Sequence, residues 1–118
     1  MVVDKKQARE LGFLAENIAA RHLEGLGFSV VDRNFRRPWG EIDIVATKDK
    51  TVHFVEVKAN RREFPGEFAP ELRANQSKLA KVIRTASLYM DDAPPNQEWT
   101  WQIDVISVTF DETNKKAK

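Results

Sequence analysis

Two neighbouring stretches of the chain decide the fold: Gly40-Glu41-Ile42-Asp43-Ile44-Val45-Ala46 and Val52-His53-Phe54-Val55-Glu56-Val57-Lys58. Both are rich in β-branched residues and alternate apolar with polar side chains, which predicts two β-strands. The polar segment between them, residues 48–50, predicts a hairpin turn. A turn centred between Asp49 and Lys50 places Asp43 directly opposite Glu56. Because side chains alternate between the two faces of a strand, Lys58 is expected on the same face as Glu56.

This pairing suggests a metal site. Two carboxylates that face each other across a strand pair repel, and a divalent cation between Asp43 and Glu56 would remove that cost. Oxygen ligands of this kind suit Mg²⁺ or Mn²⁺. A lysine beside the metal could orient an attacking water and stabilise charge on a phosphate, the chemistry of phosphodiester cleavage. The same alternation also describes a half-exposed strand in which Lys58 forms only a surface ion pair, and the strand pattern alone leaves both interpretations open.

Composition limits the function classes. The chain has 118 residues, 42% of them hydrophobic and 31% charged, as in a globular domain of ordinary size. It has no cysteine, which excludes disulfides, zinc–thiolate sites, iron–sulfur clusters and cysteine nucleophiles. No segment approaches membrane-spanning length and the first residues carry no signal-peptide pattern, so the cytoplasm is the expected location.

The remaining segments predict the rest of the fold. Helical spacing of apolar residues indicates helices over residues 5–26 and 73–90, and strand patterns cover residues 28–35 and 100–108. The expected order is therefore α-β-β-β-α-β, a single α/β domain with a mixed sheet and flanking helices. The domain is expected to span residues 1–110, followed by a disordered tail at 111–118.

Each predicted helix has an apolar face that should pack on the sheet. The expected face of the first helix consists of Leu11, Leu14, Ala15, Ile18, His22 and Leu26. The expected face of the second consists of Leu79, Val82, Ile83, Ala86 and Met90.

Two more acidic residues are candidates for the site. Glu16 lies at the margin of the first helix's apolar face, among the small residues Gly12, Ala19 and Ala20, which would let the helix approach the sheet closely. A solvated helix glutamate is the alternative. Glu41 should share the face of Asp43, either as a further metal ligand or as a charge at the rim.

The net charge is only +1, so a basic nucleic-acid surface would have to be local. Candidates for that surface are Arg33, Arg36 and Arg37 before the first motif strand, and Arg61 and Arg62 after the second. Of these, Arg36, Arg37, Arg61 and Arg62 are the expected backbone contacts to DNA. Lys78, near the start of the second helix, could meet a phosphate there, because helix N-termini attract anions. A solvated helix face is an equal alternative for Lys78.

Together these residues resemble the PD-(D/E)xK nuclease superfamily, whose fold is that of restriction endonucleases. Within it the chain is most similar to small bacterial proteins described as Holliday-junction-resolvase-like. The resemblance runs from about residue 9 to residue 108 and rests on Gly12-x-x-Ala15-Glu16-x-x-Ala19, Gly27-Phe28, Arg33-Asn34-Phe35-Arg36, Gly40-Glu41-Ile42-Asp43, Phe54-Val55-Glu56-Val57-Lys58, Lys78 and Ala86-x-x-Tyr89.

The resemblance implies a set of roles. Asp43 and Glu56 would hold Mg²⁺ or Mn²⁺ with help from the Val57 carbonyl, Lys58 would orient or activate water, and Glu16 would complete the catalytic site. Ile42 stands where the motif's proline would be. The loop after Lys58 also departs from the threonine and arginine usual in relatives, which leaves substrate preference open.

The expected function is therefore metal-dependent hydrolysis of DNA phosphodiester bonds, with branched DNA such as a Holliday junction as the analogous substrate. A homodimer is expected, because a four-way junction is two-fold symmetric. Two alternatives remain: a nucleic-acid-binding or accessory protein that keeps the fold without cleavage, and a nuclease acting on ordinary duplex or single-stranded ends.

Overall fold

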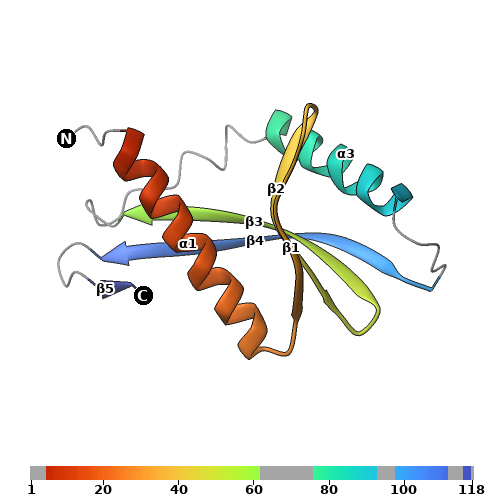
Figure 1. Ribbon diagram of the computed structural model, residues 1–118, viewed down its shortest axis with the longest axis horizontal. Coiled ribbons are helices and arrows are strands. Elements are labelled where there is room, and N and C mark those ends of the chain that lie inside the picture. Colours follow the sequence, from red (N-terminus) through yellow and green to blue (C-terminus); the bar gives the residue numbers. More distant parts are fainter. Residues whose placement is uncertain (1–4, 62–75, 93–97, 112–115, 118) are drawn as a thin grey trace.

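The computed structural model describes residues 5–61, 76–92, 98–111 and 116–117. The elements along the chain (Figure 1) are α1 (Lys5–Gly25), β1 (Ser29–Arg37), β2 (Gly40–Lys48), β3 (Thr51–Arg61), α3 (Gln76–Asp92), β4 (Thr100–Asp111) and β5 (Lys116–Ala117). The expected order of helices and strands is confirmed, with one short strand added at the end.

The strands form one mixed sheet in the order β1-β2-β3-β4-β5. β1, β2 and β3 pair antiparallel, whereas β4 pairs parallel to β3, as the crossover through α3 predicts. β5 pairs antiparallel with Phe110 and Asp111 of β4. The expected domain boundary at residue 110 and the disordered tail at 111–118 stay predictions, although Asp111 belongs to β4 and Lys116–Ala117 to β5.

The turn between β2 and β3 sets the register of the two motif strands. Lys48 pairs with Thr51, and Asp49 and Lys50 both have positive φ angles, as a tight two-residue hairpin turn requires. The ladder continues from there to Ile44 opposite Val55. This is the predicted register, so the next positions along the hairpin are Asp43 and Glu56.

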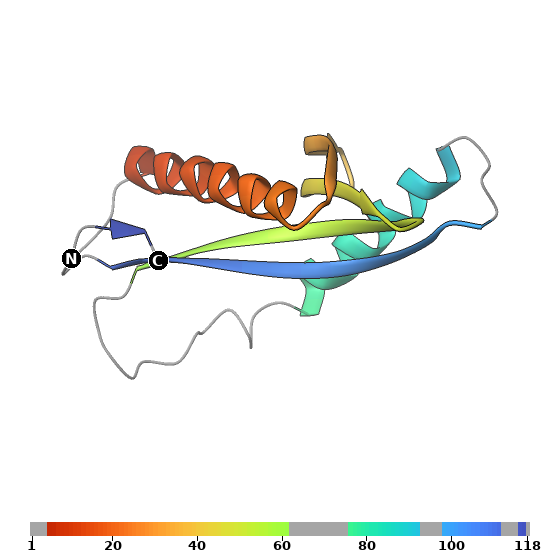
Figure 2. The same ribbon diagram turned by 90° about the horizontal axis from the view of Figure 1, so that it is seen from below.

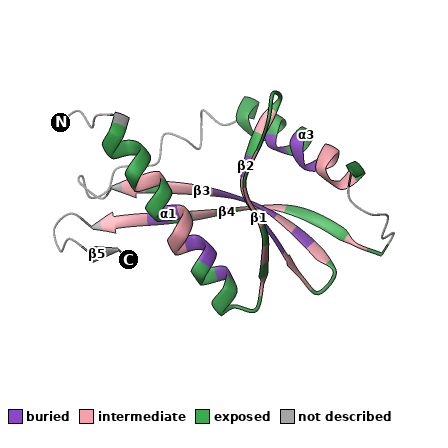
Figure 3. Ribbon diagram, viewed as in Figure 1, coloured by how far each residue is buried: buried purple, intermediate pink, exposed green. Residues whose placement is uncertain are grey.

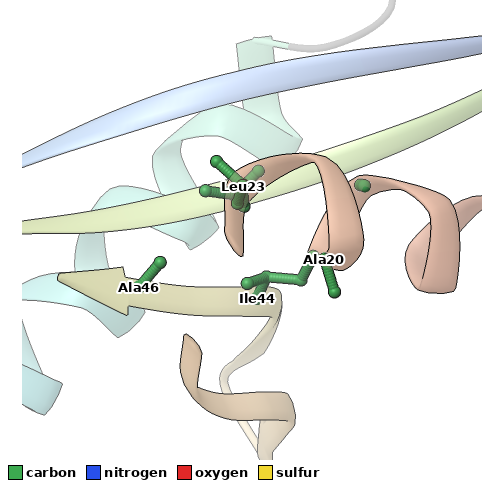
Figure 4. Close-up of a cluster of buried hydrophobic side chains, with 6 residues drawn as sticks. Ala20, Leu23, Ile44 and Ala46 are labelled. Atoms are coloured by element: carbon green, nitrogen blue, oxygen red, sulfur yellow. The ribbon is translucent and has the colours of Figure 1, made fainter. Parts of the chain in front are cut away.

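Helix α1 lies across one face of the sheet, above β3 and β4 (Figure 2). Its contact is made by Ala19, Ala20 and Leu23, which pack with Ile44, Ala46 and Val55 (Figure 4). The predicted apolar face was partly wrong, since Leu14, His22 and Leu26 are exposed. The small alanines form the contact instead, and they allow the helix backbone to lie close to the strands.

Helix α3 packs on the opposite face. Phe54 belongs to the α3 side of the core and its neighbour Val55 to the α1 side, so the two helices cover opposite faces of β3. Val82, Thr85 and Ala86 are the buried residues of α3. Leu79 and Ile83, which were expected to be buried, are exposed, because the buried stripe is centred on the contact with β2 (Figure 3).

The closest approach of α3 to the sheet occurs at Gly40, the first residue of β2. A β-carbon added to Gly40 would lie 2.5 Å from Thr85 Oγ1 and 3.3 Å from the Lys81 carbonyl oxygen. Thr85 is fully buried, and its hydroxyl donates a hydrogen bond to the same carbonyl at 2.7 Å. The hairpin therefore touches the helix backbone at a position that only glycine fits.

Gly40→Ala is expected to lower the free energy of unfolding by about 1–3 kcal/mol, the usual cost of an overpacked contact. Gly12→Ala is the matched control, because a β-carbon at Gly12 meets nothing within 4 Å and alanine favours the helix by about 1 kcal/mol. Chemical denaturation of both variants checks the prediction. A Gly40→Ala protein as stable as Gly12→Ala would contradict the close contact.

Candidate active site

The site is located where β2 separates from β3. Pairing between these strands ends at Ile44 and Val55, and beyond that point a side chain replaces the ladder. The backbone N–H of Val57 donates a hydrogen bond of 2.8 Å to Asp43 Oδ2. The Asp43 carboxylate is thereby held at the fork between the strands, with a fixed orientation and one oxygen already engaged.

Glu56 is the buried charge of the site. Its residue is only 6% exposed, and its Oε1 atom is buried with no hydrogen-bond partner. Its Oε2 atom lies 3.5 Å from Lys78 Nζ on α3. Buried polar atoms normally have a partner, so an orphaned carboxylate oxygen suggests a site for a positively charged ligand.

Glu16 reaches the same place from α1. Its side chain is largely buried, and its Oε1 atom lies 3.7 Å from a guanidinium nitrogen of Arg33. Arg33 also donates to Asn17 Oδ1 at 2.7 Å, which holds the guanidinium between helix and sheet. Like Glu56, Glu16 has one buried carboxylate oxygen without a hydrogen bond.

The protonation equilibria show that these carboxylates interact. Burial and then the charge of Asp43 raise the pKa of Glu56, while Lys78 and Lys58 oppose the shift. Burial and then Asp43 also raise the pKa of Glu16, against Arg33 and Asn34. The pKa of Asp43 is raised by burial, although the Val57 hydrogen bond and the nearby lysines lower it. Asp43 therefore interacts with Glu56 on one side and with Glu16 on the other.

Two lysines complete the cluster. The positive charge of Lys58 lowers the pKa of both Asp43 and Glu56, while its place on their side of the sheet stays a prediction. Burial alone would lower the pKa of Lys78, but its interactions with Lys58, Glu56 and Asp43 outweigh that effect and raise it. Lys78, which the sequence suggested as a DNA-backbone contact, thus lies among the carboxylates.

Sequence reasoning missed Arg33 and Asn34 as neighbours of the site. Asn34 has a φ of 52°, a left-handed conformation that asparagine tolerates better than most residues, and its side chain interacts with Glu16. The register of β1 against β2 also shifts between Val30 and Asp32. Strand alternation does not predict such a shift. The only sequence signal for these two neighbours of the site was therefore an arginine followed by an asparagine within a predicted strand.

Two of the other predicted DNA contacts, Arg36 and Arg37, are engaged by neighbours outside this cluster. Arg36 is exposed and pairs with Glu41 at 3.1 Å, which makes Glu41 a charge at the rim. The guanidinium of Arg37 lies over the ring of Phe35, 4.1 Å from its centre. Arg61 ends β3, and Arg62 lies outside the described residues.

The donor set fits a hard divalent cation in part. Within the described ranges, no three His, Cys, Asp or Glu side chains are arranged as a ready metal cage. Magnesium, however, commonly uses one or two protein carboxylates and takes its other ligands from water and substrate phosphate. Asp43 and the unpartnered Oε1 of Glu56 could provide those two carboxylates. The part of Val57 seen in contact with Asp43 is its N–H, and a role for its carbonyl stays a prediction.

The remaining polar and aromatic candidates are structural. His53 points to the α1 side, where its Nδ1 lies 2.6 Å from Asp104 Oδ2 and its ring packs against Phe28. Trp99 packs against the α3 side of the core, and Trp101 meets the edge of Phe54 at 5.6 Å between ring centres. None of these contacts reaches the carboxylates.

Comparison with known proteins places the chain in a family. The family described as Uncharacterised protein family UPF0102 matches residues 15–108, which include every residue of the site. The chain belongs to the UPF0102 family. A UPF0102 protein of Campylobacter fetus is 38% identical over 97 residues, covering 82% of this chain and 81% of the relative. A UPF0102 protein of Helicobacter pylori strain P12 is 41% identical over 91 residues, or 77% of this chain and 75% of that protein.

Membrane insertion through helices finds no support in this UPF0102 protein. Of the helices that the structure describes, neither is both long enough and apolar enough to cross a bilayer.

The unpaired oxygen of Glu56 leads to a stability prediction. Because the folded-state pKa of Glu56 is raised, its contribution to stability is fully present below the ordinary value of 4.5 and is lost as pH rises through the folded pKa. At pH 7 without divalent cations, Glu56→Gln should therefore raise the free energy of unfolding by about 1 kcal/mol, since it removes a buried charge with an unmade hydrogen bond.

Denaturation in EDTA at pH 4 and pH 7 measures this effect. Glu10→Gln, an exposed glutamate on α1, is the control and should change stability at neither pH. If Glu56→Gln and Glu10→Gln changed the free energy of unfolding equally at pH 7, burial of the Glu56 charge would not destabilise the protein.

Proposed function

We propose that this UPF0102 protein is a metal-dependent DNA endonuclease of the PD-(D/E)xK type. The observation that carries the proposal is the convergence of Asp43 and Glu56 where β2 and β3 separate, with one buried oxygen of Glu56 left without a partner. The mixed sheet between two helices, in the order α-β-β-β-α-β, supports it as well. Fold alone would not, because one fold hosts many activities.

In this proposal Asp43 and Glu56 hold Mg²⁺ or Mn²⁺, with Glu16 completing the site directly or through water. The bound cation would neutralise charge on the phosphate and increase the acidity of coordinated water. In the hydrolysis, the oxygen of a water would bond to phosphorus as the bond from phosphorus to the leaving sugar oxygen breaks, and a proton given up by the water would replace the one that the leaving oxygen takes up from solvent, so that the products are a phosphomonoester and a sugar hydroxyl. Lys58 positions the water or stabilises the charge that develops on the phosphate.

Neighbouring residues hold the carboxylates of the proposed site in position. Asp43 is oriented by the Val57 N–H, Glu16 faces Arg33, and Lys78 balances Glu56. These contacts hold the three carboxylates in place despite their repulsion. Lys78 would exchange part of its interaction with Glu56 for a substrate phosphate when the cation binds.

The proposed partner is DNA, with branched DNA as the analogous substrate, and the proposed location is the cytoplasm. Arg36, Arg37, Arg61 and Arg62 are the proposed backbone contacts. A homodimer is proposed as well. In the described part of the chain, β5 covers only Phe110 and Asp111, so the rest of the outer edge of β4 has no strand neighbour and could pair with a second copy.

Asp43→Ala, Glu56→Gln and Lys58→Ala are each expected to abolish cleavage of labelled DNA in Mg²⁺ or Mn²⁺. Loss of Lys58 removes one transition-state donor, worth about 3 kcal/mol or 10²-fold in rate. Four-way junction, duplex, flap and single-stranded substrates are compared, with EDTA as the blank and Glu10→Gln as the active control. Absence of metal-dependent cleavage from every substrate would favour a binding protein that keeps the fold.

A second measurement tests the metal site without relying on activity. Mg²⁺ or Mn²⁺ should raise the melting temperature of the wild type, because a ligand bound only by the folded state stabilises it. The rise should vanish in Asp43→Ala and persist in Lys58→Ala, which keeps both carboxylates. An undiminished rise in Asp43→Ala would place the cation elsewhere.

The dimer is tested by sedimentation of the protein alone and with a four-way junction. A two-fold dimer on the junction is expected, since two symmetry-related sites match the two strands to be cut. A monomer under both conditions would argue against junction resolution and leave simple nicking as the activity.

A further inference from the structure

A pocket of about 610 Å³ lies beside the candidate active site, between the turn of the β1–β2 hairpin and α3. Its volume falls in the range of sites that hold small organic ligands. The side chains that give it chemical character are Arg36, Arg37, Trp39, Glu41, Lys81 and Arg84. None of these was assigned to the catalytic cluster.

The pocket concentrates positive charge. Its four cationic side chains and single carboxylate give a formal charge of +3, whereas the whole chain carries only +1. Arg36 is engaged with Glu41 in a solvent-exposed pair that contributes little stability. Lys81 and Arg84 are exposed and have no ion-pair partner within the described residues. They remain available for a polyanion.

An aromatic ring is held among these charges. Trp39 is 40% exposed and forms the two-residue turn with Pro38, between the paired residues Arg37 and Gly40. Proline restricts the backbone of this turn, and Gly40 fixes it against Thr85 of α3. A rigid exposed tryptophan surrounded by cations is a platform on which a nucleobase stacks while its phosphates are neutralised. Base faces are hidden within a duplex, so such a platform selects unpaired nucleotides.

The pocket and the carboxylates share one helix. Lys78 contacts Glu56, and Lys81 and Arg84 follow it along α3 at three-residue steps. Six residues of helix span ~9 Å, which is about the rise of two or three stacked nucleotides in one strand. A strand with its phosphate at the carboxylates would therefore pass the pocket within a few nucleotides.

We propose that this pocket binds an unpaired nucleotide of the DNA substrate, with its base on Trp39 and its phosphates on Lys81 and Arg84. The inference rests on the proposed function for the identity of the polymer, and it narrows the substrate class. Among branched substrates, the preferred one carries single-stranded DNA within a few nucleotides of the cut, as in a fork, flap or gap, rather than continuous duplex or a fully paired four-way junction.

Binding is tested first, in EDTA, so that the result does not depend on cleavage. A short oligothymidylate should quench tryptophan fluorescence of the wild-type protein, and a blunt duplex of equal length should bind more weakly. Trp39→Ala should weaken oligothymidylate binding by about 10-fold, the loss expected for one base stack. Trp39→Phe should keep the affinity while losing part of the quenching signal. Arg84→Glu should weaken binding, whereas Arg21→Glu, an exposed arginine on α1, should not.

Several outcomes would overturn the inference: equal affinity for duplex and oligothymidylate, no effect of Trp39→Ala, or equally effective competition by a polyglutamate peptide. The cleavage assay then separates the two proposals. Cleavage of fork and duplex at equal rates, unchanged in Trp39→Ala, would retain the nuclease and reject the pocket's role. Trp39-dependent binding without cleavage of any DNA would reject the nuclease and support the pocket.

Discussion

The hydrogen bond from the Val57 N–H to Asp43 is the contact on which the arrangement of the site depends. At this point β2 leaves β3, and an N–H that would otherwise lose its partner is satisfied by a carboxylate. The strands can therefore diverge without leaving a buried donor unpaired. Where the strands diverge, Asp43 lies near enough to Glu56 and to Glu16 to raise the pKa of each.

The two helices pack closely against the sheet near these carboxylates. Close approach of α1 through Ala15 and Ala19, both fully buried, brings Glu16 to the carboxylates. On the other face, α3 packs closely against the β1–β2 hairpin at Gly40, and its Lys78 lies beside Glu56. Small residues therefore lie at both helix–sheet contacts, and they bring each helix close to the strands. At that distance the longer polar side chains of the helices extend toward the point where β2 separates from β3.

Much of this could be predicted from the sequence, because it depends on local rules. Strand alternation and a two-residue turn were sufficient to predict the ladder of β2 and β3 as far as Ile44 opposite Val55, the positions next to Asp43 and Glu56. The helix faces were harder to predict. Leu14, Leu79 and Ile83 are apolar and correctly spaced, yet they are exposed, because the alanines and Thr85 make the closer contacts. Hydrophobicity does not reveal which side of a helix the tertiary contacts select. The pocket at Trp39 forms only when the β1–β2 hairpin folds against α3, and the left-handed backbone of Asn34 follows from no alternation rule.

The turn at Asp49 and Lys50 limits the insertions and deletions that this chain can tolerate during evolution. Both residues adopt positive φ without glycine, and the Lys50 carbonyl accepts a hydrogen bond from Thr100 at the start of β4. Inserting or deleting one residue there would rotate an entire strand face and separate Asp43 from Glu56. The length of this hairpin is therefore as constrained as the identity of the acidic residues, and divergence in a lineage that keeps the site must be accommodated elsewhere in the chain.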